Sequence, residues 1–460
     1  MTGDGGTTAD RTAALGGDRS VPVPDPIARD YLLLALRLGQ RIDGLVDGYF
    51  GPADVKAQAD MEQLRPPARL VADAVELRGR AAGEVGEPDR RDWLARQLVA
   101  LETHARALAG ERLGYVEELG RLFDWTPERR DEARFDEAAR ELDELLPGRG
   151  TVAERLAAWD AGLVVAEDRL PAVVSWLVER DRVRAASLFG LPAGESFRAA
   201  FVRDRPWSGY NWYEGGRRSR FDLNLDLPIR APSLVQVVAH ETYPGHHLEH
   251  AWKEADLVDT LGRLEASILL INTPECLISE GLADLGVRFA VPRGEEAELL
   301  AELFDRAGIA AGQPAPAVRS LAERVVRIRP ARERLDEVAI NAALLRHADG
   351  RSHAEVLDYL VRVGRIEPTR AAKRLEFVEH PLWRSYVFVY AEGRELLRRW
   401  LDAVPAEAQA GRFGRLFHEQ LTPSAIAAEI IAAGSDPDPG AAVVPVGVSA
   451  PTTTPRASRS

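Results

Sequence analysis

The sequence predicts a mainly α-helical fold, and three observations support this prediction. Apolar residues recur three and four positions apart in long stretches, which places them on one face of a helix; examples are residues 30–42, 90–110 and 152–183. One internal region, residues 207–228, departs from this spacing. The two ends of the chain are rich in small and polar residues and lack the apolar side chains that a packed core requires.

The chain is long enough to bury a large core. It has 460 residues, of which 45% are hydrophobic and 28% charged, an ordinary composition for a globular protein. We expect disordered tails at residues 1–25 and 434–460. Between them we expect an amino-terminal helical lobe over residues 26–205 and a second lobe over residues 206–433 that carries the catalytic site. Both lobes belong to the same overall domain.

Charge and cysteine content exclude several classes of protein. The net charge of −13 argues against a general affinity for nucleic acid or anionic membranes. Cys276 is the only cysteine, so the chain forms no internal disulfide and no thiolate zinc cluster. No apolar run approaches the ~18 residues of a membrane helix, and the first residues lack the apolar stretch of a secretory signal. We therefore expect a cytoplasmic protein; the sequence does not indicate an oligomeric state.

Residues 207–228 read WSGYNWYEGGRRSRFDLNLDLP and interrupt the helical pattern. Glycines, aromatic residues and the alternating FDLNLDL are typical of a loop followed by a short strand. An extended edge here could pair with a peptide substrate through main-chain hydrogen bonds. The alternative interpretation is a surface hairpin or a bent connector.

The most informative motif is HETYPGHHLEH, at residues 240–250. It begins like HExxH, in which two helical histidines bind zinc on either side of a catalytic glutamate. Here Pro244 occupies the place of the second histidine, and His246 and His247 follow two and three residues late. We expect a helix that leads into the motif to begin with Ser233 as its capping residue and Gln236 completing a capping box.

An unbroken helix cannot bring the later histidines to His240. Seven residues of helix rise by about 10.5 Å, whereas two nitrogens on one tetrahedral zinc lie only about 3–3.5 Å apart. Pro244 cannot donate the helical hydrogen bond, and Gly245 permits conformations that other residues resist. The pair predicts a kinked or bulged helix, for example a π-type bulge, that returns either His246 or His247 toward His240.

A third ligand is predicted in TPECLISEGLADLG, at residues 273–286. Thr273 is a predicted helix cap, with Pro274 at the first helical position. Glu275 then lies in the first turn, where the helix dipole alone explains an acid. Glu280 lies deeper and is the preferred metal ligand. Asp284, one turn later on the same face, could hold the far nitrogen of a ligating imidazole.

These residues carry a family resemblance. The motif at 240–247 and the sequence SEGLADLG at 279–286 resemble a bacterial family catalogued as domain of unknown function 885, with its HExxPGHH motif and downstream EGxA. The resemblance covers about residues 200–430. This family looks like a distant relative of helical zincin metallopeptidases. It implies a large helical zincin-like fold, similar to neurolysin and related carboxypeptidases, with a short β segment before the metal-binding helix.

The resemblance also implies roles for single residues. Helical metallopeptidases often carry Gly directly before the second ligand, which selects His246 over His247. Asn224 matches an Asn before the family's motif, and Tyr390 matches its Tyr-x-x-Gly pattern, where a tyrosine resembles an oxyanion donor. Tyr386, one turn earlier, is the alternative. The chain departs from the family at two positions, with Glu249 for Gln and Leu282 for Trp.

Together these expectations describe a metal-dependent hydrolase, a metallopeptidase that cleaves a peptide or small amide. One Zn²⁺ ion, or another divalent metal, is bound by His240, His246 and Glu280, and Glu241 is the general base. Tyr390 supports the developing oxyanion. His247, Asp284, Asn224 and Tyr386 support the ligands or contact substrate.

Three alternatives remain open from the sequence. His250 lies four residues after His246, so these two could form a separate ligand pair, which would leave His240 without a role. A two-histidine and carboxylate set is also compatible with iron or manganese, and hence with oxidative, lyase or other hydrolase chemistry. The third alternative is a catalytically degenerate protein that only binds metal. Intact Glu241 argues against it.

Overall fold

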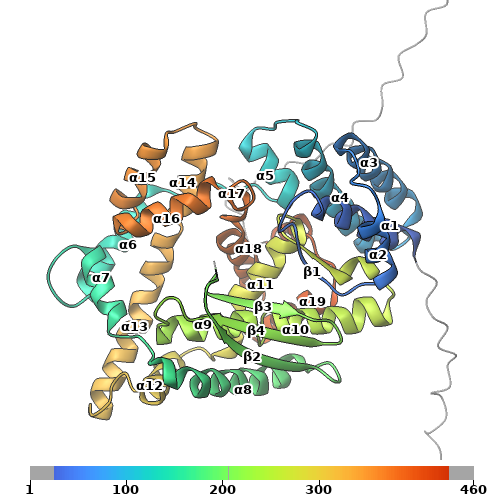
Figure 1. Cartoon of the computed structure of the whole chain (residues 1–460). Coiled ribbons are helices and arrows are strands. Elements are labelled where there is room, and N and C mark those ends of the chain that lie inside the picture. The colour runs from blue at the N-terminus through green and yellow to red at the C-terminus, as the bar shows by residue number, and fades with distance from the viewer. Residues whose placement is uncertain (1–24, 206, 435–460) are drawn as a thin grey trace, which may run out of the picture.

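The computed structural model describes residues 25–205 and 207–434, and it is mainly helical, as predicted (Figure 1). The two predicted tails lie outside the described residues except for their inner ends. Asp25 caps the first helix, because its carboxylate accepts a hydrogen bond from the backbone nitrogen of Ile27 at 2.8 Å.

The amino-terminal helices form a group of their own beside the central sheet (Figure 1). Apolar residues on α1 and on its neighbours pack into one buried cluster, since the helical spacing puts them on facing sides. A short antiparallel ribbon joins this group to the carboxyl-terminal half, where β1 (Val46–Tyr49) pairs with β5 (Ile268–Leu270). The helices of the group are α1 (Pro26–Gly39), α2 (Ala53–Met61), α3 (Pro67–Glu84) and α4 (Pro88–Leu108).

The next segment crosses the molecule and returns. The stretch 152–183, helical by its spacing, forms two α-helices: the first ends at Ala161 with Gly162 as its cap, and the second begins at Leu170 with Pro171 in its first turn. The helices of this segment are α5 (Tyr115–Phe123), α6 (Glu132–Leu145), α7 (Val152–Ala161), the short 3₁₀ turn η1 (Glu167–Arg169) and α8 (Leu170–Phe189).

A three-stranded sheet lies at the centre, in front of the metal-motif helices (Figure 1). Its order is β2 (Ser196–Val202), β4 (Arg218–Asn224), β3 (Gly209–Tyr213). β4 pairs with β2 in parallel and with β3 antiparallel. The predicted extended segment FDLN is therefore the central strand, and the edge nearest the motif is β3. The 205/206 boundary between the predicted lobes falls inside this sheet, so the two ranges share it.

The remaining elements are helical apart from β5. They are α9 (Ala231–Glu241), α10 (His246–Lys253), the π-helical η2 (Glu254–Thr260), η3 (Leu264–Ser267), α11 (Pro274–Ala290), α12 (Glu296–Ala307), α13 (Ala315–Asp336), α14 (Val338–His347), α15 (His353–Arg362), α16 (Pro368–Glu379), α17 (Trp383–Tyr386), α18 (Val389–Asp402), α19 (Ala406–His418) and α20 (Pro423–Ala432). No helix in the described ranges is both long enough and apolar enough to cross a bilayer. The cytoplasmic location stays a prediction.

Helices α11 and α18 approach closely where two glycines meet. A methyl group on Gly281 would come within 2.5 Å of the carbonyl carbon of Gly393, and one on Gly393 would come within 2.3 Å of the Leu277 oxygen. Only glycine fits at both positions without a backbone shift. The contact brings α17 and the start of α18 against α11, and so places Tyr386 and Tyr390 near Glu280.

Candidate metal centre

The start of α9 differs from the prediction. The residue before the helix is Arg230, which makes no capping hydrogen bond through its side chain, and Ser233 lies inside the first turn. A tertiary contact fixes this start, because Arg230 pairs with Val164 in an isolated β-bridge. Pro232 fits the first turn, where no helical N–H is needed. Gln236 does not complete a capping box and instead donates to the Asp284 backbone oxygen at 3.1 Å.

The helical structure is completely interrupted between α9 and α10. Helix α9 ends at Glu241 and α10 begins at His246; the peptide bond between Tyr243 and Pro244 is cis. A β-carbon on Gly245 would lie 1.8 Å from the His240 carbonyl oxygen, so no side chain fits there. The predicted interruption is therefore present, as two helices rather than one bulged helix. The π-helical stretch lies farther on, at Glu254–Thr260.

The break brings His240 and His246 side by side. Their ring centroids are 4.7 Å apart and the ring planes are nearly perpendicular, at 89°. Both rings point toward the carboxylate of Glu280 on α11. His240 Nε2 lies 3.3 Å from one carboxylate oxygen, and His246 Nε2 lies 3.6 Å from the other. Two imidazole nitrogens and a carboxylate from three helices thus converge on one small volume.

Each of the two imidazoles is held from its far side. His240 Nδ1 lies 3.1 Å from Asp284 Oδ1, the partner predicted for a ligating imidazole. His246 Nδ1 lies 3.4 Å from Glu249 and 3.3 Å from the Ser279 hydroxyl. With Nδ1–H donated to these groups, release of the second ring proton leaves the Nε2 lone pair of each imidazole facing the Glu280 carboxylate.

Glu249 is itself fully buried and paired. Its carboxylate accepts a hydrogen bond from Ser279 at 2.6 Å and forms an ion pair with Lys253 at 2.6 Å. Burial raises the pKa of Glu249, but the charge of Lys253 and the hydrogen bond with His246 hold that pKa well below its usual range. Glu249, one of the two residues that depart from the resembled family, is therefore a buried carboxylate with its own counter-charge.

The carboxylate of Glu280 has one oxygen satisfied and one without a hydrogen bond. Oε1 accepts a hydrogen bond from the Tyr386 hydroxyl at 2.6 Å, whereas Oε2 is buried and accepts none from the described residues. Burial raises the pKa of Glu280, yet the positive charge of His246 and the adjacent His240 imidazole lower it strongly. A buried, ionised oxygen without a donor is the partner that a cation requires.

Glu241 completes the group. His240, Glu241 and His246 each offer one potential ligand atom, and these atoms lie within 4.8 Å of one another. The Glu241 backbone oxygen accepts a hydrogen bond from Asn211 Nδ2 at 2.6 Å, which ties the end of α9 to strand β3. Burial raises the pKa of Glu241, an effect that the charges of His240 and His246 oppose.

His247 turns away from this group. It is completely buried, with Nδ1 2.8 Å from the Ser219 hydroxyl of β4 and Nε2 3.1 Å from Glu195 Oε2. Glu195 also accepts a hydrogen bond from the Tyr243 hydroxyl at 2.5 Å. The structure therefore brings His246 to His240, and His247 joins the break between the helices to the sheet.

The two tyrosines differ in their surroundings. Tyr386 is 7% exposed and bonded to Glu280, whereas Tyr390 is 40% exposed. The ring centroid of Tyr390 lies 6.2 Å from that of His240 and 5.5 Å from that of Tyr386. Tyr390 thus stands beside the two histidines with its side chain open to solvent.

Two other residues singled out by the sequence lie outside this group. Asn224 binds backbone: its amide donates to the carbonyl oxygens of Arg205 and Trp207 at 2.9 Å each, and its Oδ1 accepts from the Asp226 nitrogen at 3.1 Å. It anchors the loop that leads into β3. Glu275 accepts a hydrogen bond from Trp93 and pairs with Lys253.

The alternative ligand pair is also present as geometry. His246, Glu249 and His250 offer ligand atoms within 4.8 Å of one another, and the His246 and His250 rings stack at 5.7 Å. Lys253 occupies one side of Glu249, however, and its positive charge disfavours a second cation there. Within residues 25–205 and 207–434, no lysine or arginine lies in an ion pair with the carboxylate of Glu241 or Glu280.

Several residues beside the site carried no signal in the sequence. Asn211 and Tyr210 belong to the non-helical stretch, but nothing in their spacing indicated contact with Glu241 or with β1. Ser279 precedes Glu280 and was taken only as part of the motif. Asp47, on β1, comes from a segment far away in the chain. Each reaches the site through tertiary packing.

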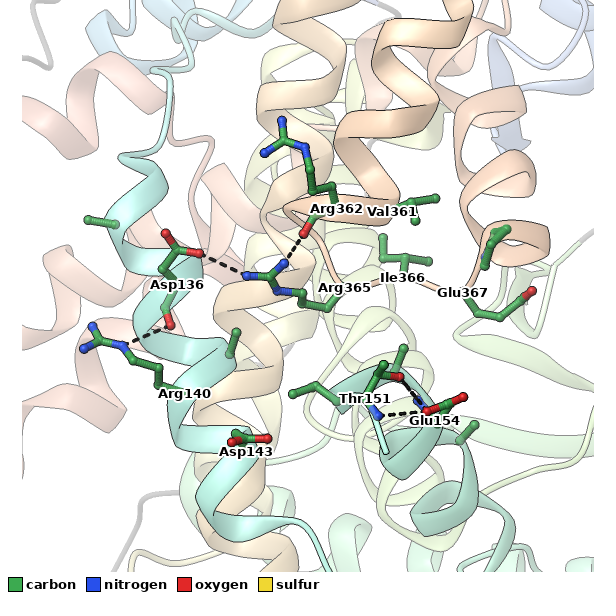
Figure 2. A pocket seen from close by; sticks show the side chains of 16 residues that line it. Asp136, Arg140, Asp143, Thr151, Glu154, Val361, Arg362, Arg365, Ile366 and Glu367 are labelled. Atoms are coloured by element: carbon green, nitrogen blue, oxygen red, sulfur yellow. Dashed lines mark hydrogen bonds and ion pairs between the residues drawn. The ribbon is translucent and has the colours of Figure 1, made fainter. Parts of the chain in front are cut away.

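A large cavity lies elsewhere, between α6, α7 and the α15–α16 corner (Figure 2). Its volume is about 1160 Å³. The charged side chains on its wall pair locally: Arg365 bonds to Asp136 at 3.3 Å, and Glu154 bonds to Thr151 in a capping box. None of its lining residues belongs to the histidine and carboxylate group, so the candidate metal centre lies apart from this cavity.

Comparisons with known proteins return little. No protein-family profile matches the chain, and no curated protein matches it. One solved structure, the "putative lipoprotein" from Colwellia psychrerythraea, is 14% identical, with a TM-score of 0.47 over 80% of this chain and 67% of that one. The resemblance to the domain-of-unknown-function 885 family therefore stays a prediction.

Proposed function

We propose that this protein is a zinc-dependent hydrolase, and specifically a peptidase of the helical zincin-like kind that its HExxPGHH motif suggests. The observation that carries the proposal is the convergence of His240 Nε2 and His246 Nε2 on the Glu280 carboxylate, at 3.3 and 3.6 Å. Two neutral nitrogens and one carboxylate are a common ligand set of catalytic zinc, which keeps a further position open.

The residues present fit a divalent cation. Glu280 Oε2 is buried without a hydrogen-bond donor among the described residues, and a cation would satisfy it. Asp284 and Glu249 support the outer nitrogens of the two histidines, as the partners of metal ligands usually do. His240, His246 and Glu280 are therefore the proposed ligands.

In the proposed mechanism, the chain supplies a base and a hydrogen-bond donor around the scissile bond. A zinc ion, when bound, supplies Lewis-acid polarisation of the substrate carbonyl and lowers the pKa of water. Glu241 accepts the proton of the attacking water and passes it to the leaving amine. Tyr390 donates a hydrogen bond to the oxygen that becomes negative.

The strand β3 gives the substrate a place to lie. It is an edge strand, and Asn211 within it touches the backbone of Glu241. A substituent on Gly209 would come within 2.9 Å of Val237 on α9 and within 3.6 Å of Glu241 Oε1, so glycine there lets β3 pack closely against the end of α9 that carries the base. An extended peptide pairing with this edge would pass the base.

The same donor set supports a second candidate. Two histidines and one carboxylate also bind iron or manganese, with oxidative, lyase or other hydrolase chemistry. A separate alternative is a catalytically degenerate protein, which would have kept the fold in evolution but lost the metal. Intact Glu241 favours the hydrolase.

Elemental analysis of the purified wild type, beside His240→Ala, His246→Ala, His247→Ala and Glu280→Ala, tests the proposal. We expect about one zinc per chain in the wild type and in His247→Ala, and loss of zinc in the other three. Iron with oxygen consumption would favour the second candidate. A wild type that binds no metal at all would contradict both.

A further inference from the structure

Asp47 lies at an irregularity in the β1–β5 ribbon. Val46 pairs with Leu270 and Gly48 pairs with Leu269, so Asp47 is an extra residue without a partner across the ladder. Bulges of this kind redirect a side chain and occur often next to active sites. The Asp47 side chain is exposed, and its carboxylate accepts a hydrogen bond from the Tyr210 hydroxyl of β3.

This contact places Asp47 beside the candidate metal centre. Tyr210 is followed by Asn211, which holds the Glu241 backbone. Burial by the surrounding protein raises the pKa of Asp47, the Tyr210 hydrogen bond lowers it, and the charges of Glu280 and His246 add smaller opposing effects. Asp47 is thus packed among protein groups, its pKa responds to the charges of Glu280 and His246, and the residue is still exposed to solvent. Through Tyr210 it lies against β3, the strand that holds the end of α9.

The charges around the site leave Asp47 without a cation. Asp284 lies against His240 and 3.6 Å from Arg394, and Glu249 is paired with Lys253. Among the described residues, Asp47 makes no ion pair; its partner is a neutral phenol. Arg394 and Lys253 are therefore already paired with acidic side chains, and the charge left without an ion pair is the negative charge of Asp47. A ligand that enters here finds a carboxylate for an amine, and no free cation for a carboxylate.

We propose that Asp47 binds the protonated α-amino group of a peptide substrate, with Tyr210 orienting the carboxylate. The assignment rests on the proposed peptidase function and adds its substrate class: short peptides cleaved near a free amino terminus. An α-amino group, with a pKa of about 7.7–8.0, is mostly charged at pH 7. A charge-assisted hydrogen bond to Asp47 fixes the amino terminus of the substrate peptide, and so determines which peptide bond lies at Glu241.

The test uses the zinc-loaded full chain and two random octapeptide libraries, identical except that one is amino-terminally acetylated. Mass spectrometry reads the initial rates and the cleaved positions. We expect the free-amine library to be cleaved near its amino end about 10–100-fold faster, as one charge-assisted bond predicts. Asp47→Asn should remove this preference and raise KM on a free-amine peptide.

Asp43→Asn is the matched control, because Asp43 is an exposed acid of the same segment; it should keep the preference. Equal cleavage of both libraries by the wild type would overturn the Asp47 assignment and leave the hydrolase standing, whatever the variant does. A preference that persists in Asp47→Asn, or that follows lysine side chains instead of the terminus, would overturn it too. Cleavage of neither library would overturn the proposed peptidase and this assignment with it.

Discussion

The two faces of α10 carry neighbouring histidines with different surroundings. His246 faces Glu280 on α11, and its side chain remains 13% exposed with Nε2 directed into the site. His247 faces the sheet, is fully buried, and has both nitrogens within hydrogen-bond distance of Ser219 and Glu195. The two identical side chains thus differ in whether a ring nitrogen is available to bind a ligand. One has a nitrogen available to a ligand, while the other is occupied in joining helix to sheet.

The largest expected effect concerns the catalytic face. Glu241→Gln should lower kcat by about 10²–10⁴-fold, because the amide cannot accept the proton. Zinc content should stay at the wild-type level, since the proposed ligands are untouched. Steady-state kinetics with elemental analysis measures both. Full turnover in this variant would disprove the role of Glu241 as base.

The next effect separates the two tyrosines. Tyr390→Phe should lower kcat by about 10²–10³-fold by removing the oxyanion donor, with little change in KM. Tyr386→Phe is its control, since Tyr386 donates to Glu280 and lies away from solvent. We expect it to alter zinc affinity more than kcat. The reverse pattern would exchange the two roles.

The break that separates the two faces can be tested directly. Gly245→Ala places a methyl group 1.8 Å from the His240 carbonyl oxygen, so the backbone must move. We expect a loss of more than about 2 kcal/mol in the free energy of unfolding, together with weaker zinc binding. Gly86→Ala, in a loop with no atom within 4 Å of the new methyl, should change neither. Chemical denaturation compares them.

The structural face should respond in stability rather than in metal binding. His247→Ala removes one hydrogen-bond partner from each of the Glu195 and Ser219 side chains, which should cost about 1–3 kcal/mol. Its zinc content should match that of the wild type. Denaturant titration and elemental analysis measure the two effects. Zinc loss in a folded His247→Ala protein would mean that this residue, and not His246, is the ligand.

The last expected effect is a pH dependence of zinc affinity. Without metal, burial lowers the pKa of His246, but the charge of Glu280 and the Glu249 hydrogen bond outweigh burial and raise it to about 10. Below that pH the ring carries a proton that zinc must displace. Affinity should therefore rise between pH 6 and 8, by up to about tenfold per unit for each proton released. Competition with a chelator at several pH values measures the slope, and a flat profile would contradict it.

The sequence by itself indicated the features that depend on neighbours along the chain. Helical spacing predicted the mainly helical class, and Thr273 was a predicted cap that the structure confirms. Pro244 and Gly245 predicted the interruption, because a missing N–H and a missing side chain act locally. Glu280 and Asp284, one turn apart on α11, were predicted to share a face, and both meet His240.

Tertiary structure decided whatever depends on partners distant in the chain. The direction of α10 after the break sends His246 toward α11 and His247 toward β4, and residue spacing could not distinguish them. The pairing of Arg230 with Val164 moved the start of α9 away from Ser233. Asp47 reaches the site only because β1 pairs with β5, more than two hundred residues later. Local rules fix where a helix can form or stop, but packing determines what each side chain meets.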